Sequence, residues 1–241
     1  MIRPDGTRDT TTEVYWLQSV SLFADLRVPA DRPAGTGKTG FDNYTDAELT
    51  RLARMSGFGG VLEVEGSVCR WLHALDFHPA GRAPDEAHFR LDGDILIETG
   101  IHANYEEIWH RVTPPGAPSA AFCSDEPGRE GILVVAGGFF LSIESRSSIL
   151  PEAESLAALV ERDLAASDRN SAIVHLDMRI AHGRAGGDWP IVRSTHPWLE
   201  ETGLFAGQMV AFDGNKLEIA GNRRWRLVES NVGAGELARY F

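Results

Sequence analysis

Alternation of hydrophobic and polar residues dominates this chain and predicts β-strands. In the run from Val14 to Pro29, Ser19, Ser21, Asp25 and Arg27 fall on one face of an extended strand. This period of two is typical of a half-buried strand. The opposite, mainly apolar face carries Trp16, Gln18, Val20, Leu22, Ala24, Leu26 and Val28.

Shorter β-rich runs follow, and turn residues separate them. Between Val61 and Val112 the runs are divided by Gly, Asp or Pro, and D-G-D at Asp92 is a hairpin signal. A second hairpin signal, D-G-N, begins at Asp213. Several hairpins in succession favour an up-and-down barrel.

Two short helices interrupt the strands. Thr45 and Glu48 form a capping box for a helix that ends before Gly57. The second helix is expected in P-E-A-E-S-L-A-A-L-V-E-R, where Pro151 suits a first helical position. Each half of the chain therefore has strands around one short helix.

An internal repeat divides the chain. W-L-H-A-L-D-F-H-P from Trp71 matches W-P-I-V-R-S-T-H-P from Trp189, so Trp, His and Pro recur 118 residues apart. The segments around Trp109 and Trp225 repeat at nearly the same spacing, which indicates a tandem duplication. We expect one unit over residues 1–112, a second over residues 131–241, and a linker rich in Pro and Gly over residues 113–130.

Three segments in the same order resemble a known family. They are Y-W-L-Q-S-V-S-L-F-A-D-L-R-V-P, I-E-T-G from Ile97 leading to E-E-I-W-H-R-V, and G-I-L-V-V-A-G-G-F-F-L-S-I-E-S. These blocks resemble those of the fungal Hri family, a resemblance that covers most of the chain. It implies two tandem lipocalin-like antiparallel β-barrels and transfers no catalytic residue. We therefore predict an all-β protein with two short helices and two such barrels from an internal duplication.

The charge of the chain narrows the expected partners. The formal net charge is −12 and the isoelectric point is about 5.1. Nucleic acids and anionic membranes attract concentrated positive charge, so we expect neither partner. No apolar run approaches a membrane span, no leader-like segment is visible, and Cys69 and Cys123 are the only cysteines. We expect a cytoplasmic protein.

A glycine-rich segment imitates a phosphate-binding loop. A-G-T-G-K-T-G over residues 34–40 has the Lys and Thr of that motif, but Arg32 stands where its first glycine belongs. The expected helix begins only after Thr45, too late for its dipole to face a phosphate. A-I-V-H-L-D, ending at Asp177, imitates the acidic strand of the same enzymes. We expect an ordinary loop and no cofactor.

Near the end of the first unit, acidic and histidine residues occupy even-numbered positions, which fall on one face of an extended strand. They are Glu98, His102, Glu106 and His110, which could serve as metal ligands. The opposite parity carries Ile95, Ile97, Ile101, Tyr105 and Trp109. Since strands normally place apolar residues inward, we interpret the polar set as a solvated face and expect no metal site.

Tryptophans and one histidine give the candidate site. Trp16, Trp71 and Trp109 are expected inside the first barrel, where His73 shares the face of Trp71. Aromatic walls suit a small apolar or aromatic ligand, although large aromatic side chains more often simply fill the core of a small barrel. Gln18 is the other inward polar candidate, and either polar side chain could instead make a structural hydrogen bond.

The repeat allows the two barrels to be compared. Ile191 takes the place of His73 in the second unit, and Arg193 takes that of Leu75. Arg193 could pair with a ligand carboxylate or form an internal salt bridge. The two interiors should therefore differ in chemistry.

Three functions remain open from the sequence. The one we favour is binding of a small apolar or aromatic ligand in the first barrel, with Gln18 and His73 orienting it. The second is a cofactor-independent isomerase, cyclase or hydratase with His73 as acid or base. The third is a protein-interaction module without a ligand. Ligand identity, oligomeric state and whether the protein is an enzyme are not determined by these residues.

Overall fold

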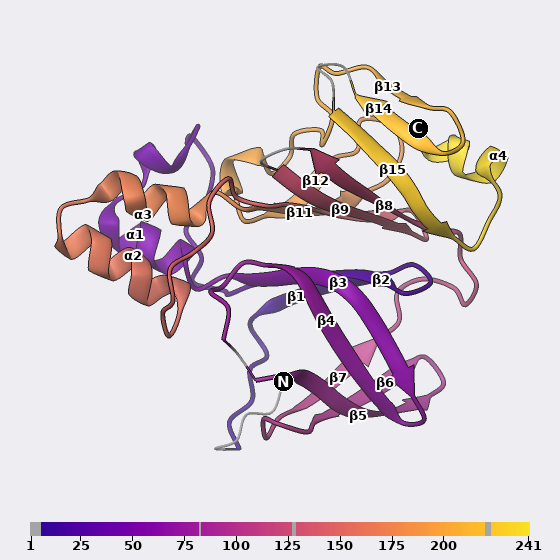
Figure 1. Cartoon of the computed structure of the whole chain (residues 1–241), viewed down its shortest axis with the longest axis horizontal. Helices are drawn as coiled ribbons and strands as arrows, with labels where there is room; N and C mark the ends of the chain where they lie inside the picture. The colour runs from indigo at the N-terminus through magenta and orange to yellow at the C-terminus, as the bar shows by residue number, and fades with distance from the viewer. Residues whose placement is uncertain (1–5, 82, 127–128, 220–222) are drawn as a thin grey trace.

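Two curled antiparallel sheets form most of the molecule (Figure 1). The computed structural model describes residues 6–81, 83–126, 129–219 and 223–241. The predicted fold class is confirmed: the chain is mostly β, and each sheet is a half-barrel. None of the helices in the described ranges is long and apolar enough to cross a lipid bilayer.

The first sheet is a seven-stranded meander in which every strand pairs with the next along the chain. The D-G-D turn is confirmed, because Asp92 pairs with Ile95 and Gly93 adopts a left-handed φ of 61°. The strands are β1 (Glu13–Gln18), β2 (Leu22–Val28), β3 (Ser56–Glu65), β4 (Val68–Asp76), β5 (Asp85–Asp92), β6 (Ile95–Gly100) and β7 (Glu106–His110).

The single strand predicted from Trp16 to Val28 is wrong. The chain reverses between Gln18 and Leu22, and β1 and β2 pair with Gln18 opposite Phe23. Directly paired residues of an antiparallel ladder lie on one face. Trp16 consequently shares a face with Asp25, its partner, and not with the even-numbered apolar residues of β2.

The second sheet contains eight strands in the order β12-β11-β10-β9-β8-β15-β14-β13. The segment predicted as a linker is partly strand, because β8 lies within it and pairs with both β9 and β15. The strands are β8 (Ser119–Glu126), β9 (Arg129–Ala136), β10 (Phe139–Glu144), β11 (Arg179–Arg184), β12 (Ile191–Ser194), β13 (Val210–Phe212), β14 (Lys216–Ile219) and β15 (Arg223–Ser230).

The described residues contain four α-helices, and three gather at one end of the sheets (Figure 1). The Thr45 and Glu48 capping box is confirmed at α1 (Asp46–Leu52). The second predicted helix begins later than expected. Pro151 was predicted as its first residue, but α2 (Leu156–Ala165) begins at Leu156, and Ser155 is its N-cap. The remaining helices are α3 (Arg169–Leu176) and α4 (Ala234–Leu237), with 3-10 turns at Phe41–Asn43, Pro197–Leu199 and Ala238–Tyr240.

Helix α3 corrects a second sequence expectation. The A-I-V-H-L-D segment, interpreted as an aliphatic strand, is helical. Asp168 caps this helix by accepting a hydrogen bond from the backbone N–H of Ser171. This segment therefore does not form the acidic strand that a nucleotide site would require.

The two sheets pack against each other through their convex faces, and both contribute to the core between them. Strand β2 supplies Leu22, Ala24 and Leu26, while β10 supplies Leu141 and Ile143. Helices α1, α2 and α3 cover one end of this shared core. Separate apolar clusters occupy the two concave faces. The next side chains along β2 therefore point into the first concave face.

Candidate functional site

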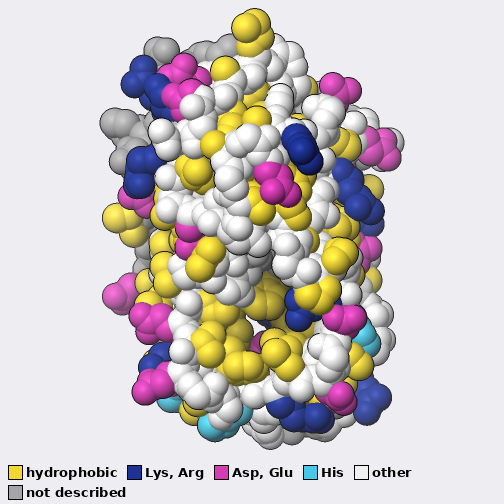
Figure 2. Space-filling model, turned by 90° about the vertical axis from the view of Figure 1, so that its right-hand side faces the viewer, with side chains coloured by type: hydrophobic (Ala, Val, Ile, Leu, Met, Phe, Trp, Pro, Cys, Tyr) yellow, Lys and Arg dark blue, Asp and Glu magenta, His cyan; other side chains and the backbone are white. Residues whose placement is uncertain are grey.

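A cavity of about 1250 Å³ opens on the concave side of the first sheet. Figure 2 shows a hollow in the half of the molecule formed by this sheet, with hydrophobic side chains around it. Loop residues 145–150, from the second half of the chain, also line this cavity. Ligand pockets commonly measure about 300–1,000 Å³ and carry a few convergent polar groups, so this cavity has room for a small molecule.

The three predicted tryptophans all line this cavity. The rings of Trp16 and Trp109 have centroids 5.8 Å apart and an interplanar angle of 57°. Trp16 and Trp71 both pack against the apolar cluster that contains Phe58. The indole nitrogen of Trp16 is buried and has no hydrogen-bond partner in the described parts of the chain. The wall thus retains an unused donor.

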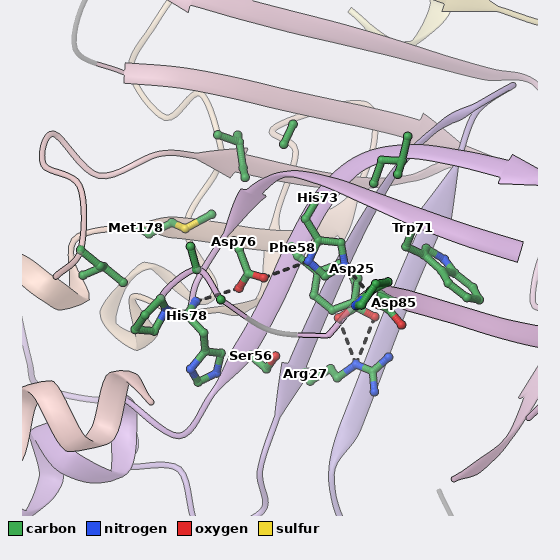
Figure 3. Close-up of a pocket in the computed structure, with 18 of the residues that line it drawn as sticks. Asp25, Arg27, Ser56, Phe58, Trp71, His73, Asp76, His78, Asp85 and Met178 are labelled. Atoms are coloured by element: carbon green, nitrogen blue, oxygen red, sulfur yellow. Dashed lines mark hydrogen bonds and ion pairs between the residues drawn. The ribbon is translucent and has the colours of Figure 1, made fainter. Parts of the chain in front are cut away.

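His73 lines the cavity as predicted, but two carboxylates fix it. Its Nδ1 lies 2.9 Å from Asp76 and its Nε2 lies 3.1 Å from Asp85 (Figure 3). The ring also stacks on Phe58 at 4.0 Å. Burial lowers the pKa of His73, but the bonds to the two carboxylates outweigh it and raise the pKa to about 9. At neutral pH this side chain is an imidazolium, which cannot accept a proton.

Arg27 on β2 binds two carboxylates on the concave face of the first sheet. It donates to Asp25 at 3.1 Å from the same strand and to Glu107 at 2.8 Å from β7. Its guanidinium also lies 5.8 Å from the ring centroids of Phe58 and Trp109. Burial raises the pKa of Asp25 to about 6, although Arg27 opposes that shift. This network connects β2, near one edge of the first sheet, with β7 at the other edge.

Glu98 on β6 is the buried carboxyl with neutral hydrogen-bond donors. Its side chain accepts from the Tyr105 hydroxyl at 2.9 Å and from the Trp109 indole nitrogen at 3.0 Å, and the residue is 5 % exposed. Burial raises the pKa of Glu98 to about 7, and the nearby Glu107 adds to the shift. A carboxyl that titrates near neutrality can accept or donate a proton.

The sequence interpretation missed Glu98, Asp25 and Glu107. Glu98 was expected on a solvated face, whereas it pairs with Glu107 on the cavity side of β6 and β7. The parity of Glu107 with Trp109 was an available signal, because alternate residues of one strand share a face. No such signal existed for Asp25, since its position depends on the unpredicted hairpin. In the described ranges, no group of three or more His, Cys, Asp or Glu side chains could hold a metal ion.

Two predicted site residues lie away from the cavity lining. Gln18 donates from Nε2 to the carbonyl of Val20 in the hairpin turn. Arg193 donates to the Glu13 carboxylate of the first sheet at 2.6 and 3.0 Å. The first contact shapes a turn, and the second links the two sheets.

The glycine-rich segment over residues 34–40 is a loop whose polar groups bind within the chain. Lys38 donates to the carbonyl of Asn43, and the backbone N–H of Thr39 donates to the Asn43 side chain at 2.8 Å. Helix α1 begins only at Asp46. Its N-terminus does not adjoin the glycines, as a phosphate loop would require.

The concave face of the second sheet is apolar, and its aromatic side chains leave a smaller pocket of about 430 Å³ beside Trp189 and Phe241. Trp189 stacks on Phe241 with centroids 5.1 Å apart, and its Nε1 donates to the Tyr240 carbonyl. Equivalent register positions carry Ile191 where β4 has His73, and Ile219 where β6 has Glu98. The two concave faces therefore differ in chemistry, and the polar cavity belongs to the first.

Comparisons with known proteins identify the fold. No protein-family model and no curated protein sequence matches this chain. The crystal structure of the uncharacterized protein YLR301w from Saccharomyces cerevisiae is similar, with a TM-score of 0.53 and 11 % identity over 92 % of each chain. At that identity the likeness concerns the fold alone. The resemblance to the fungal Hri family remains a prediction.

Proposed function

We propose that the concave face of the first sheet binds a small aromatic or apolar molecule. The observation that carries this proposal is the contrast between the two concave faces. Phe241 and its neighbours leave a pocket of only about 430 Å³ on the second, whereas the first keeps a cavity of about 1250 Å³ lined by Trp16, Trp71 and Trp109. Side chains that served only as packing would be expected to close such a space, because protein interiors are densely packed.

The polar groups of the cavity are arranged to orient a ligand. His73 is fixed by two carboxylates and by its stack on Phe58. Glu98 is fixed by two neutral donors. Groups held in this way need little reordering when a ligand arrives, which favours binding. Aromatic rings supply most of the contact area, and these polar groups supply the specificity.

Native mass spectrometry of the freshly purified protein provides the first test. The proposal predicts a mass above that of the denatured chain, together with a releasable small molecule. A fluorescence titration with the neutral probe N-phenyl-1-naphthylamine provides the second. We expect W109A to bind this probe about 5- to 150-fold more weakly, since an aromatic contact contributes about 1–3 kcal/mol.

I108A is the matched control, because Ile108 neighbours Trp109 but is 52 % exposed and outside the cavity lining. It should bind the probe as the wild type does. A bare native mass together with no probe binding by the wild type would contradict ligand binding. That result would favour the protein-interaction module, which needs no cavity ligand.

A cofactor-independent isomerase, cyclase or hydratase in the same cavity is the second candidate function. It is favoured by Glu98, whose pKa of about 7 suits proton transfer at neutral pH. His73 would then donate and orient, since it is protonated at that pH. Conversion of the released molecule by the wild type and not by E98Q would support catalysis. Return of the molecule unchanged would support binding alone.

A further inference from the structure

The charge of the cavity extends the proposed function to a class of ligand. We propose that the ligand is a cation, a small aromatic or apolar molecule bearing a protonated amine, whose charge lies beside Glu98 and the rings of Trp16 and Trp109. This inference rests on the proposed function of the same cavity.

Acidic side chains outnumber arginines around the cavity. Seven carboxyl groups, three arginines and the His73 imidazolium belong to the described lining, and the structure describes no lysine in it. The carboxyl groups are those of Asp25, Asp76, Asp85, Glu86, Glu98, Glu107 and Glu130. A cavity with this balance attracts cations and repels anions.

The three arginines are already engaged. Arg27 pairs with Asp25 and Glu107. Arg129 pairs with Asp177, which lies outside the lining. Arg146 donates to backbone carbonyls, including those of Asp76 and Phe77. None of the three forms an ion pair with Glu98.

Glu98 is the carboxyl group with which a bound cation would form an ion pair. Its two donors, Tyr105 and Trp109, are uncharged. A buried carboxylate without an opposite charge is unfavourable, and an ion pair removes part of that cost. Burial and Glu107 raise the pKa of Glu98, and the positive charge of Arg27 offsets only part of that shift. A protonated amine can donate to the carboxylate while its apolar part remains on the aromatic wall.

The aromatic rings favour the same charge. Trp16 and Trp109 lie beside each other, and the indole nitrogen of Trp109 donates to Glu98. The faces of indole rings attract cations. Arg27 demonstrates this inside the cavity, because its guanidinium lies 5.8 Å from the centroid of the Trp109 ring. Arg27 is held by contacts with aromatic rings and by ion pairs with carboxylates, and a ligand ammonium would use the same two kinds of interaction.

Three indoles that differ in charge test the inference by isothermal titration calorimetry at pH 8. The probes are tryptamine, a cation; 3-ethylindole, which is neutral; and indole-3-propionate, an anion. We expect tryptamine to bind the wild type at least about tenfold more tightly than 3-ethylindole, and indole-3-propionate to bind most weakly. E98Q should bind 3-ethylindole unchanged and lose most of the preference for tryptamine.

E106Q is the matched control, because Glu106 lies on β7 next to Glu107 but outside the cavity lining. It should keep the wild-type preference. Thermal unfolding of both variants reports whether they fold. Equal binding of all three indoles, or an undiminished preference in folded E98Q, would overturn the cationic ligand and leave the proposed function intact. Failure of every indole and of N-phenyl-1-naphthylamine to bind the wild type would overturn both.

Discussion

The carboxyl group of Glu98 couples the chemistry of the cavity to the stability of the fold. Burial raises its pKa from 4.5 to about 7 in the folded chain, so the folded state holds this proton more tightly than the unfolded state. Stability from this group is therefore present at low pH and is lost as the pH rises between these two values.

Replacing Glu98 by Gln removes this dependence. Between pH 4.5 and 7.5 we expect the free energy of unfolding of the wild type to fall by about 2–3 kcal/mol relative to E98Q. Urea denaturation at several pH values measures the difference. Asp25 titrates in the same range but is common to both proteins, so its effect cancels. Parallel pH profiles of the two proteins would show that folding does not raise the pKa of Glu98.

Helix α1 shows how a local signal acts on the whole core. Thr45 and Glu48 satisfy each other's backbone N–H groups, and the helix they begin buries Leu49 and Leu52 in the core between the sheets. Loss of an N-cap side chain typically costs about 1 kcal/mol. Because the helix packs into the shared core, that loss should appear in global unfolding.

T45A should therefore lower the free energy of unfolding, measured by chemical denaturation, by about 1 kcal/mol. Thr50 lies inside the same helix, where its side chain caps nothing, so T50A serves as the control. That control should change stability by less than about 0.5 kcal/mol. Equal effects of the two substitutions would contradict a specific role for the cap.

Strand β2 shows why the face of a residue is harder to predict than the strand itself. Its even-numbered residues enter the core between the sheets, while Asp25 and Arg27 face the cavity. Both faces are buried, so alternation cannot mean apolar inside and polar outside. The sequence pattern of β2 identified a strand and misassigned the surroundings of its charged residues.

The two halves of the molecule are joined by more than their shared core. Glu229 of β15 accepts three hydrogen bonds from the β1–β2 turn, from the N–H groups of Ser21 and Leu22 and from the Ser21 hydroxyl, at 2.7–2.8 Å. Arg193 and Glu13 join the sheets elsewhere. We therefore expect both halves to unfold together, in one transition.

E229A tests this coupling. It should lower the free energy of unfolding by about 2–3 kcal/mol, because it leaves backbone donors of the turn without a charged acceptor. Far-UV circular dichroism and tryptophan fluorescence should still report one coincident transition. E161A, at an exposed site on α2, should change little. Two separated transitions in the wild type would show that the halves fold independently.

Local patterns alone determined a large part of this protein. Alternation determined that the chain is mostly strands, the D-G-D and D-G-N turns determined two hairpins, and Thr45 with Glu48 determined where α1 begins. The repeated Trp, His and Pro indicated a duplicated organisation. These features depend on neighbours in sequence, whose interactions a short segment already contains. Alternation within β4 and β7 likewise placed Trp71, His73 and Trp109 on the cavity face, whereas Trp16 lies there because of the β1–β2 hairpin.

Only the tertiary structure decided the polar chemistry of the cavity. Alternation assigns residues to opposite faces but does not say which face another layer covers. Asp25 and Arg27 point into the cavity because the chain turns after Gln18. Glu98 is inside because of the register between β6 and β7. Arg27 can be buried because Glu107, 80 residues away in sequence, meets it across the sheet. Burial of a charge depends on such distant partners, and they come together only when the chain folds.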